Sequence, residues 1–296
     1  MPLRDFVVLM IVCTLWALSN VVSKFVVSVL EVPPLFYAAA RFAVVLAALF
    51  PFLRSRQRLS GRLLLAAFLM GAGNFGLLFV GLKYSTPSAA GVVMQLNMPF
   101  TLLLSMAFLG ERVRPVRQLG IFLAFAGVLM VMWDPHGFAL SGGLVMVAGA
   151  AAMASVGVIL TKQIEGVRPI VFQAWVGATS VLPLALLSVI LEPGQLQLAL
   201  DAGWRFWAAV IFSAGVVSVG AHTVYILLLQ RYEAGVISAL ILVTPLATIG
   251  LSVALLGDHF SPRLIVGSAL ALTGVLIIAL RGNPAARLLL AIQRRT

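Results

Sequence analysis

Charged residues are scarce in this sequence, and acidic residues are the scarcest of them. Asp, Glu, Lys and Arg together make up 10% of the 296 residues, and only nine residues are Asp or Glu. In a typical soluble domain, about a quarter of the residues are charged. The single cysteine, Cys13, cannot form a disulfide within the chain or hold a metal cluster. The composition therefore argues against a soluble domain and against a metal site, and we expect no cofactor.

Long apolar runs take the place of charge. Hydrophobic residues make up 62% of the chain, and the mean hydropathy is +1.11. A helix needs about 20 apolar residues to cross a hydrocarbon core about 30 Å thick. Ten segments approach or exceed this length: 6–28, 35–53, 63–82, 87–109, 117–133, 142–162, 170–191, 205–229, 234–256 and 264–280. We therefore predict an all-α membrane protein with ten transmembrane helices joined by short connectors.

Basic residues gather on one side of these predicted spans. With ten spans both termini share a side, and that side holds 15 of the 20 Lys and Arg residues. The other side holds four, and Arg41 lies within a span. Because cytoplasmic loops are enriched in Lys and Arg, the pattern predicts a multi-pass protein of the cell (inner) membrane with both termini in the cytoplasm. The scattered positive charge indicates topology and no nucleic-acid partner.

A sequence repeat relates the two halves of the chain. "GERVRPVRQLGIFLAFAG" follows the fourth span, and "GDHFSPRLIVGSALALTG" follows the ninth. Five positions recur at an offset of 147: Gly110, Glu111, Pro115, Gly120 and Gly127 match Gly257, Asp258, Pro262, Gly267 and Gly274. Since each copy holds five spans, an odd number, the second copy is inserted upside down. We predict one repeat at 1–138, an inverted one at 139–282, and a basic cytoplasmic tail at 283–296 on the lipid surface. This plan is typical of secondary transporters that bind substrate near mid-membrane between the halves.

The doubled pattern resembles the EamA branch of the drug/metabolite transporter superfamily over essentially the whole chain. Within that family, "LWALSNVVSKF" and "PPLFYAAARF" look most like the YddG-type exporters of aromatic and other neutral amino acids and of methyl viologen. The resemblance implies a basket of helices 1 to 4 and 6 to 9 around a central cavity, with helices 5 and 10 packed peripherally. It also implies export of small amphipathic metabolites by alternating access.

The fourth span carries polar groups that lipid cannot satisfy. In "MQLNMPFT", Gln95 and Asn97 precede Pro99, so the carbonyl of Gln95 loses its usual partner and the helix should kink or loosen there. Such freed groups are tolerated at mid-depth where they line a wet cavity. We interpret this kink as part of the substrate site, with Thr244 and Pro245 as its inverted counterpart. The alternative is a packing kink whose amides bond neighbouring helices.

Polar residues in the first two spans point to the same cavity. Trp16, Asn20 and Lys24 recur at i, i+4 and i+8, which places them on one helix face. Asn20 fits either the cavity or a helix contact, and Lys24 is expected to snorkel toward the outer end. Arg41 costs about 2.5–3.5 kcal/mol on insertion scales and therefore needs a partner. Either a substrate carboxylate or the carbonyls at the end of a neighbouring helix would serve.

Aromatic side chains complete the predicted site. Trp16, Tyr37, Phe75 and Trp175 fall deep enough to form an aromatic wall, which suits apolar or aromatic side chains and cationic rings. His222 and Tyr225 share a face of the eighth span with Ser218, although a lone histidine is more often a helix-packing residue. The predicted substrate-binding residues are Trp16, Asn20, Tyr37, Arg41, Phe75, Gln95, Asn97, Trp175, His222 and Tyr225, with Pro99 and Pro245 as kinks that permit gating.

Rival functions differ in what they require of the sequence. A membrane enzyme needs a catalytic set, and the sequence has no HExxH, no Gly-x-Ser-x-Gly and no pair of carboxylates within the spans. We therefore predict a transporter and not an enzyme. A drug or organic-cation exporter and a non-transporting receptor or scaffold remain alternatives. The expected partners are the lipid bilayer and a small-molecule substrate, and the sequence is compatible with a monomer.

Overall fold

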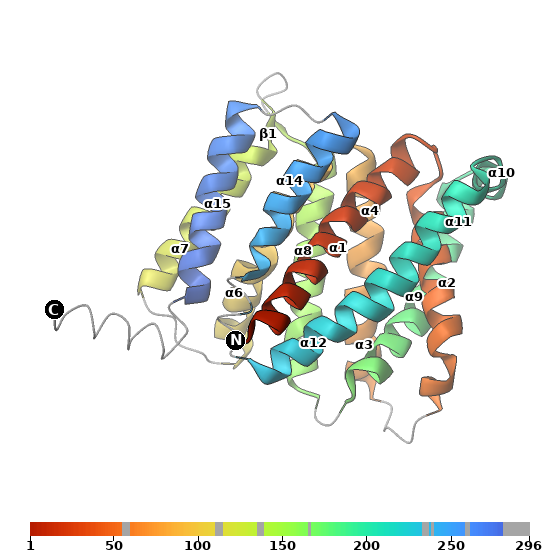
Figure 1. Ribbon diagram of the computed structural model, residues 1–296, viewed down its shortest axis with the longest axis horizontal. Helices are drawn as coiled ribbons and strands as arrows, with labels where there is room; N and C mark the ends of the chain where they lie inside the picture. Colours follow the sequence, from red (N-terminus) through yellow and green to blue (C-terminus); the bar gives the residue numbers. More distant parts are fainter. Residues whose placement is uncertain are drawn as a thin grey trace.

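The computed structural model describes residues 1–54, 60–109, 115–134, 139–164, 167–232, 237, 240–257 and 261–280, and helices dominate them (Figure 1). Within this described part, nine helical runs are long and apolar enough to cross a bilayer. Six runs are single helices: α1 (Leu3–Ser28), α2 (Pro34–Leu53), α7 (Pro115–Met132), α8 (Gly142–Lys162), α9 (Pro169–Leu191) and α15 (Pro262–Leu280). Three runs consist of consecutive segments: α3 (Gly61–Phe68), η1 (Leu69–Gly73) and α4 (Asn74–Lys83); α5 (Pro87–Val93), η2 (Met94–Leu96) and α6 (Asn97–Leu109); and α11 (Gly203–Ile211), η3 (Phe212–Ala221) and α12 (His222–Arg231).

Shorter elements complete the chain. The apolar helix α14 (Val243–Leu256) forms the second part of the predicted span 234–256, much of whose first part lies outside the described residues. A short helix, α10 (Gln195–Asp201), precedes α11, and a two-residue ladder joins β1 (Trp133–Asp134) to β2 (Ala139–Leu140). The predicted all-α fold with ten helices in two inverted repeats is confirmed. The fifth span ends at Met132, one residue earlier than predicted, because Trp133 pairs with Leu140 in that ladder.

The relation between the two inverted repeats is seen most directly where α7 packs against α15, side by side at one end of the molecule (Figure 1). A β-carbon built on Gly120 would lie 2.8 Å from the carbonyl oxygen of Gly274, and one built on Gly274 would lie 2.5 Å from that of Gly120. Gly127 and Gly267 approach each other in the same reciprocal way. Gly267 is the repeat counterpart of Gly120 and Gly274 that of Gly127, so each glycine of α7 meets the counterpart of the other one, and the two copies run in opposite directions. Small residues permit this backbone contact between membrane helices.

Both repeats interrupt a helix just before a proline. Helix α5 passes into the 3₁₀ turn η2 at Met94, which has φ −60° and ψ −18°, and Leu242 before α14 has nearly the same backbone, φ −60° and ψ −12°. Pro99 follows the end of η2 by three residues, and Pro245 follows Leu242 by three. Proline removes the backbone donor that would continue the ladder. The predicted loosening before Pro99 is confirmed, and its counterpart lies at Leu242.

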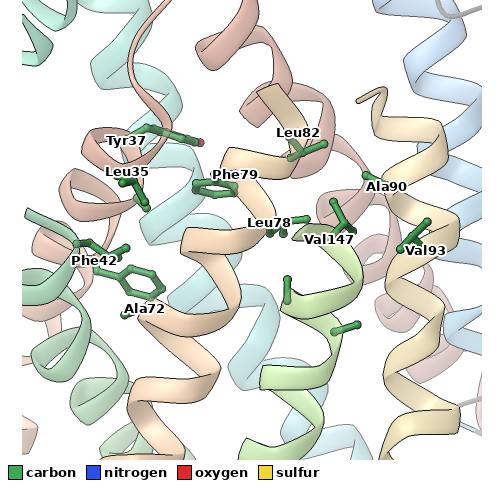
Figure 2. Packing of buried hydrophobic residues seen from close by; sticks show 14 of the residues in the cluster. Leu35, Tyr37, Phe42, Ala72, Leu78, Phe79, Leu82, Ala90, Val93 and Val147 are labelled. Carbon is green, nitrogen blue, oxygen red and sulfur yellow. The ribbon is translucent and has the colours of Figure 1, made fainter. Parts of the chain in front are cut away.

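A continuous apolar core joins the two halves. Figure 2 shows α4 contributing Leu78 and Phe79 to this core, with Tyr37 and Phe42 of α2 toward one side and Val147 of α8 toward the other. All of these side chains are buried. The two repeats thus pack together through apolar contacts, and the few buried polar groups stand out against them.

Polar contacts tie helix ends together on both sides of the molecule. The Glu192 carboxylate accepts hydrogen bonds from the first backbone N–H groups of α2, those of Leu35 and Phe36, at 2.8 and 2.9 Å. Backbone N–H groups at a helix start lack intrahelical partners, so this acid caps α2 from the far end of α9. At the N-terminal side, the Tyr232 hydroxyl donates to Asp5, and this bond raises the pKa of Tyr232.

Candidate substrate site at the repeat interface

Helix α2 presents two polar side chains, one turn apart, to the second repeat. The Tyr37 hydroxyl and Ser213 Oγ form a hydrogen bond of 2.6 Å. Arg41 Nε and Nη2 both donate to Ser218 Oγ, at 3.0 and 2.9 Å. Tyr37 and Arg41 are 0% and 1% exposed. Both serines lie on η3, so these bonds connect the two repeats inside the core.

Aromatic rings surround the guanidinium. Its central carbon lies 4.4 Å from the centre of the Phe75 ring and 5.9 Å from that of Phe79. Tyr37 stacks on Phe79 with ring centres 5.0 Å apart, and Figure 2 shows the two rings facing each other across α2 and α4. Rings of this kind attract a cation through their electron-rich faces. Sequence reasoning found Phe75 but not Phe79, although the spacing of four residues between them was a usable signal.

The charge of Arg41 has no acidic counterpart in the part of the chain that the structure describes. It is the one charged side chain among the buried residues described. A serine hydroxyl satisfies hydrogen-bond donors, but it is neutral and leaves the positive charge uncompensated. The sequence left a carboxylate and helix-end carbonyls open as partners, and the structure supplies Ser218 instead. An anion that reached this point would complete the pair.

A second aromatic group lies where α1 meets α12. The Trp16 ring centre is 5.2 Å from that of His222 and 5.1 Å from that of Tyr225. His222 Nδ1 lies 2.9 Å from the carbonyl oxygen of Val217, which makes this nitrogen the donor. The indole N–H of Trp16 and the hydroxyl of Thr244 are buried without a hydrogen-bond partner among the described residues. His222 lies four residues after Ser218, the partner of Arg41, on the same helical run.

Asn97 of the fourth span makes a different contact. Ser155 Oγ of α8 donates to the side-chain and backbone oxygens of Asn97, both at 2.9 Å, and Thr101 also donates to the Asn97 side chain. This contact matches the helix-packing alternative for Asn97. Gln95 is partly buried on η2.

Asn20 and Trp175 have less specific surroundings, whereas Lys24 has defined partners. Asn20 is partly buried on α1, and Trp175 is partly buried on α9 against the main core. Lys24 donates to the carbonyls of Leu82 and Lys83, at 2.8 and 3.3 Å, where α4 ends. The structure therefore brings Tyr37, Arg41 and Phe75 together, joins Trp16, His222 and Tyr225 nearby, and places Asn97 against α8.

Comparison with known protein families identifies the family to which this chain belongs. The EamA-like transporter family matches residues 5–133 and 140–280, once for each half of the chain. The chain belongs to this family. It is a membrane transporter with two EamA-like repeats.

Curated relatives and a solved structure agree with this assignment. The chain is 29% identical over 290 residues to a probable amino-acid metabolite efflux pump of Salmonella typhimurium, covering 94% of this chain and 95% of the relative. It is 28% identical, with the same coverage, to a protein of the same name from Escherichia coli K12. It is 28% identical over 216 residues to the uncharacterized transporter YyaM of Bacillus subtilis, covering 69% of each chain. A crystal structure with 21% sequence identity matches with a TM-score of 0.61 over 94% of this chain and 98% of that chain, which shows the shared fold.

Proposed function

We propose that this EamA-family transporter exports small amphipathic metabolites, foremost aromatic and other neutral amino acids, by alternating access in the cell (inner) membrane. Both termini lie in the cytoplasm, and the protein needs no metal or cofactor. The buried Arg41 at the repeat interface carries this proposal, because it has no acidic partner among the described residues. A substrate carboxylate would supply the missing negative charge.

The surroundings of Arg41 support an amino acid over other anions. Phe75, Phe79 and Tyr37 offer apolar rings beside the guanidinium, which suits a substrate that carries a carboxylate and an apolar side chain on one small molecule. The nearby group of Trp16, His222 and Tyr225 adds more ring surface. Two relatives are named as probable amino-acid metabolite efflux pumps, which favours the same class.

The alternative of an organic-cation exporter rests on those same rings, since ring faces also bind cations. Against it, a cation placed beside the Arg41 guanidinium would be repelled. A non-transporting receptor would bind ligand without exchanging it across the membrane.

Counterflow in proteoliposomes separates these functions. Vesicles loaded with unlabelled phenylalanine should take up labelled phenylalanine, and methyl viologen in the same assay should exchange weakly. Arg41→Gln should lower the apparent affinity for phenylalanine by about tenfold or more, because a charge-assisted hydrogen bond is lost. Arg263→Gln is a matched control, since Arg263 also bonds a neutral acceptor, the carbonyl of Trp133, but at an exposed helix end. Exchange of methyl viologen alone would support the cation exporter, and binding without exchange would support a receptor.

A further inference from the structure

The two serines that meet α2 are five residues apart, on a helix with unusual geometry. Ser213 and Ser218 both lie in η3, which is π-helical from Phe212 to Ala221. In an α-helix, residues five apart point about 140° away from each other. In a π-helix the hydrogen bonds run from i to i+5, so residues five apart lie above one another. The π-helical geometry therefore places both serines toward Tyr37 and Arg41.

The matching helix crossing in the other repeat has no such polar pair. There η1, also π-helical, packs against α9 through Gly71. A β-carbon on Gly71 would lie 2.9 Å from Val176 Cγ1 and would also clash with Ser180 Oγ. The Ser180 hydroxyl is buried and has no hydrogen-bond partner among the described residues. One crossing is thus closely packed through glycine, whereas the crossing at η3 holds an arginine.

Ser218 occupies one particular edge of the guanidinium. Nε and Nη2 share an edge, and both donate to the same oxygen, Ser218 Oγ. The centre of the Phe75 ring lies 4.4 Å from the central carbon of the group. The other edge, formed by Nη1 and Nη2, carries a pair of N–H donors whose spacing matches the two oxygens of a carboxylate.

We propose that Ser218 is a positioning residue that fixes the Arg41 guanidinium so that its Nη1 and Nη2 edge receives the substrate carboxylate. This inference rests on the proposed function, because it assigns the carboxylate-binding step to Arg41. When the hydroxyl is absent, Nε and Nη2 become buried donors without an acceptor, which is costly. The guanidinium then turns toward other acceptors, and its Nη1 and Nη2 edge no longer faces the substrate carboxylate.

Binding of two matched ligands to the purified full-length protein tests this role. Phenylalanine carries the carboxylate, and phenylalaninamide has the same ring and amine without it. The measured quantity is the ratio of the two dissociation constants, determined for wild type, Ser218→Ala, Ser218→Cys and Ser218→Thr. We expect Ser218→Ala to weaken the binding of phenylalanine about tenfold and to leave the binding of phenylalaninamide unchanged. Ser218→Thr should keep the wild-type ratio of the two dissociation constants. Ser180→Ala is the matched control, a buried serine at the opposite crossing.

The outcomes separate this inference from the function on which it rests. Wild-type protein that binds both ligands equally would overturn the carboxylate role of Arg41 and this inference with it. A wild-type preference for phenylalanine that persists in Ser218→Ala would overturn only the role of Ser218. If Ser218→Ala weakens the binding of both ligands equally, Ser218 has only a structural role and the inference is overturned. Tighter binding of phenylalanine by Ser218→Ala would overturn it as well. If Ser218→Ala does not fold, Ser218→Cys preserves the side-chain volume with a weaker acceptor and must lower the ratio for the inference to hold.

Discussion

Gly127 of α7 and Gly267 of α15 approach so closely that neither position has room for a side chain. A β-carbon on Gly127 would lie 2.5 Å from the carbonyl oxygen of Gly267, and one on Gly267 would lie 2.8 Å from that of Gly127. In the sequence repeat, at an offset of 147, Gly127 matches Gly274 and Gly267 matches Gly120, and Gly274 and Gly120 also meet in space. A two-fold axis that exchanges the two copies therefore exchanges the contact of Gly127 with Gly267 and the contact of Gly274 with Gly120. The axis that relates the two repeats passes between these two contacts at this end of the molecule.

Replacing Gly127 with alanine should destabilise the protein. The added carbon meets backbone atoms of Gly267 and Ala271, which cannot move aside as a flexible side chain can. Overpacking of this kind costs about 1–3 kcal/mol. The free energy of unfolding, measured by titration with a denaturing detergent, should fall by this amount. Gly250→Ala is the control, because a β-carbon there meets nothing within 4 Å; equal stability of the two variants would contradict the close contact.

Much of the fold was predictable because the bilayer thickness sets the length of each transmembrane helix and the sequence repeat sets the number of helices. The predicted span 142–162 coincides with α8, and the glycines that recur at a fixed offset contact one another between α7 and α15. The break before Pro99 followed from the missing N–H of proline. The π-helical segments η1 and η3 were not predicted, because a wider helical turn leaves no distinct mark in hydrophobicity or residue type.

The candidate site was predictable in its charge but not in its contacts. Arg41 stands out because an arginine in a span is costly. Its partner Ser218 could not be identified, since the facing side of η3 depends on π-helical geometry. The contact of Asn97 with Ser155 depends on how α6 rotates against α8, which a nearly uniform apolar sequence does not specify.

Replacing Pro99 with alanine should slow transport without unfolding the protein. Alanine restores the backbone N–H, so η2 can continue as regular α-helix from α5 into α6. A straighter fourth span should exchange more slowly between states. Counterflow rates should fall several-fold while substrate affinity changes little. Pro183→Ala is the control, because α9 runs unbroken past Pro183. Wild-type rates in folded Pro99→Ala protein would assign this proline to packing alone.

Lys24 should help to close the side of the molecule opposite the N-terminus. Its ammonium donates to the last carbonyls of α4, those of Leu82 and Lys83, which lack intrahelical donors. Lys24→Met should free α1 from α4 there. In a Cys13→Ala background that carries Ser28→Cys, the rate at which a maleimide labels the new cysteine should be several-fold higher with Lys24→Met than without it. Lys83→Met serves as the control, since the side chain of Lys83 is exposed; similar rates in both variants would contradict a role in closure.

Transport should not require a proton gradient. Proton-coupled carriers usually bury a carboxyl group that changes protonation between states, but in the sequence all nine Asp and Glu residues fall in loops or at span ends. Histidine is the residue type that ordinarily titrates near neutral pH, and in His222, the histidine within a span, Nδ1 is engaged by the carbonyl of Val217. Phenylalanine flux in proteoliposomes should therefore be the same with and without an imposed pH gradient or a protonophore, in wild type and in His222→Asn alike. Uphill accumulation that depends on the pH gradient and disappears in His222→Asn would instead make this histidine the proton carrier.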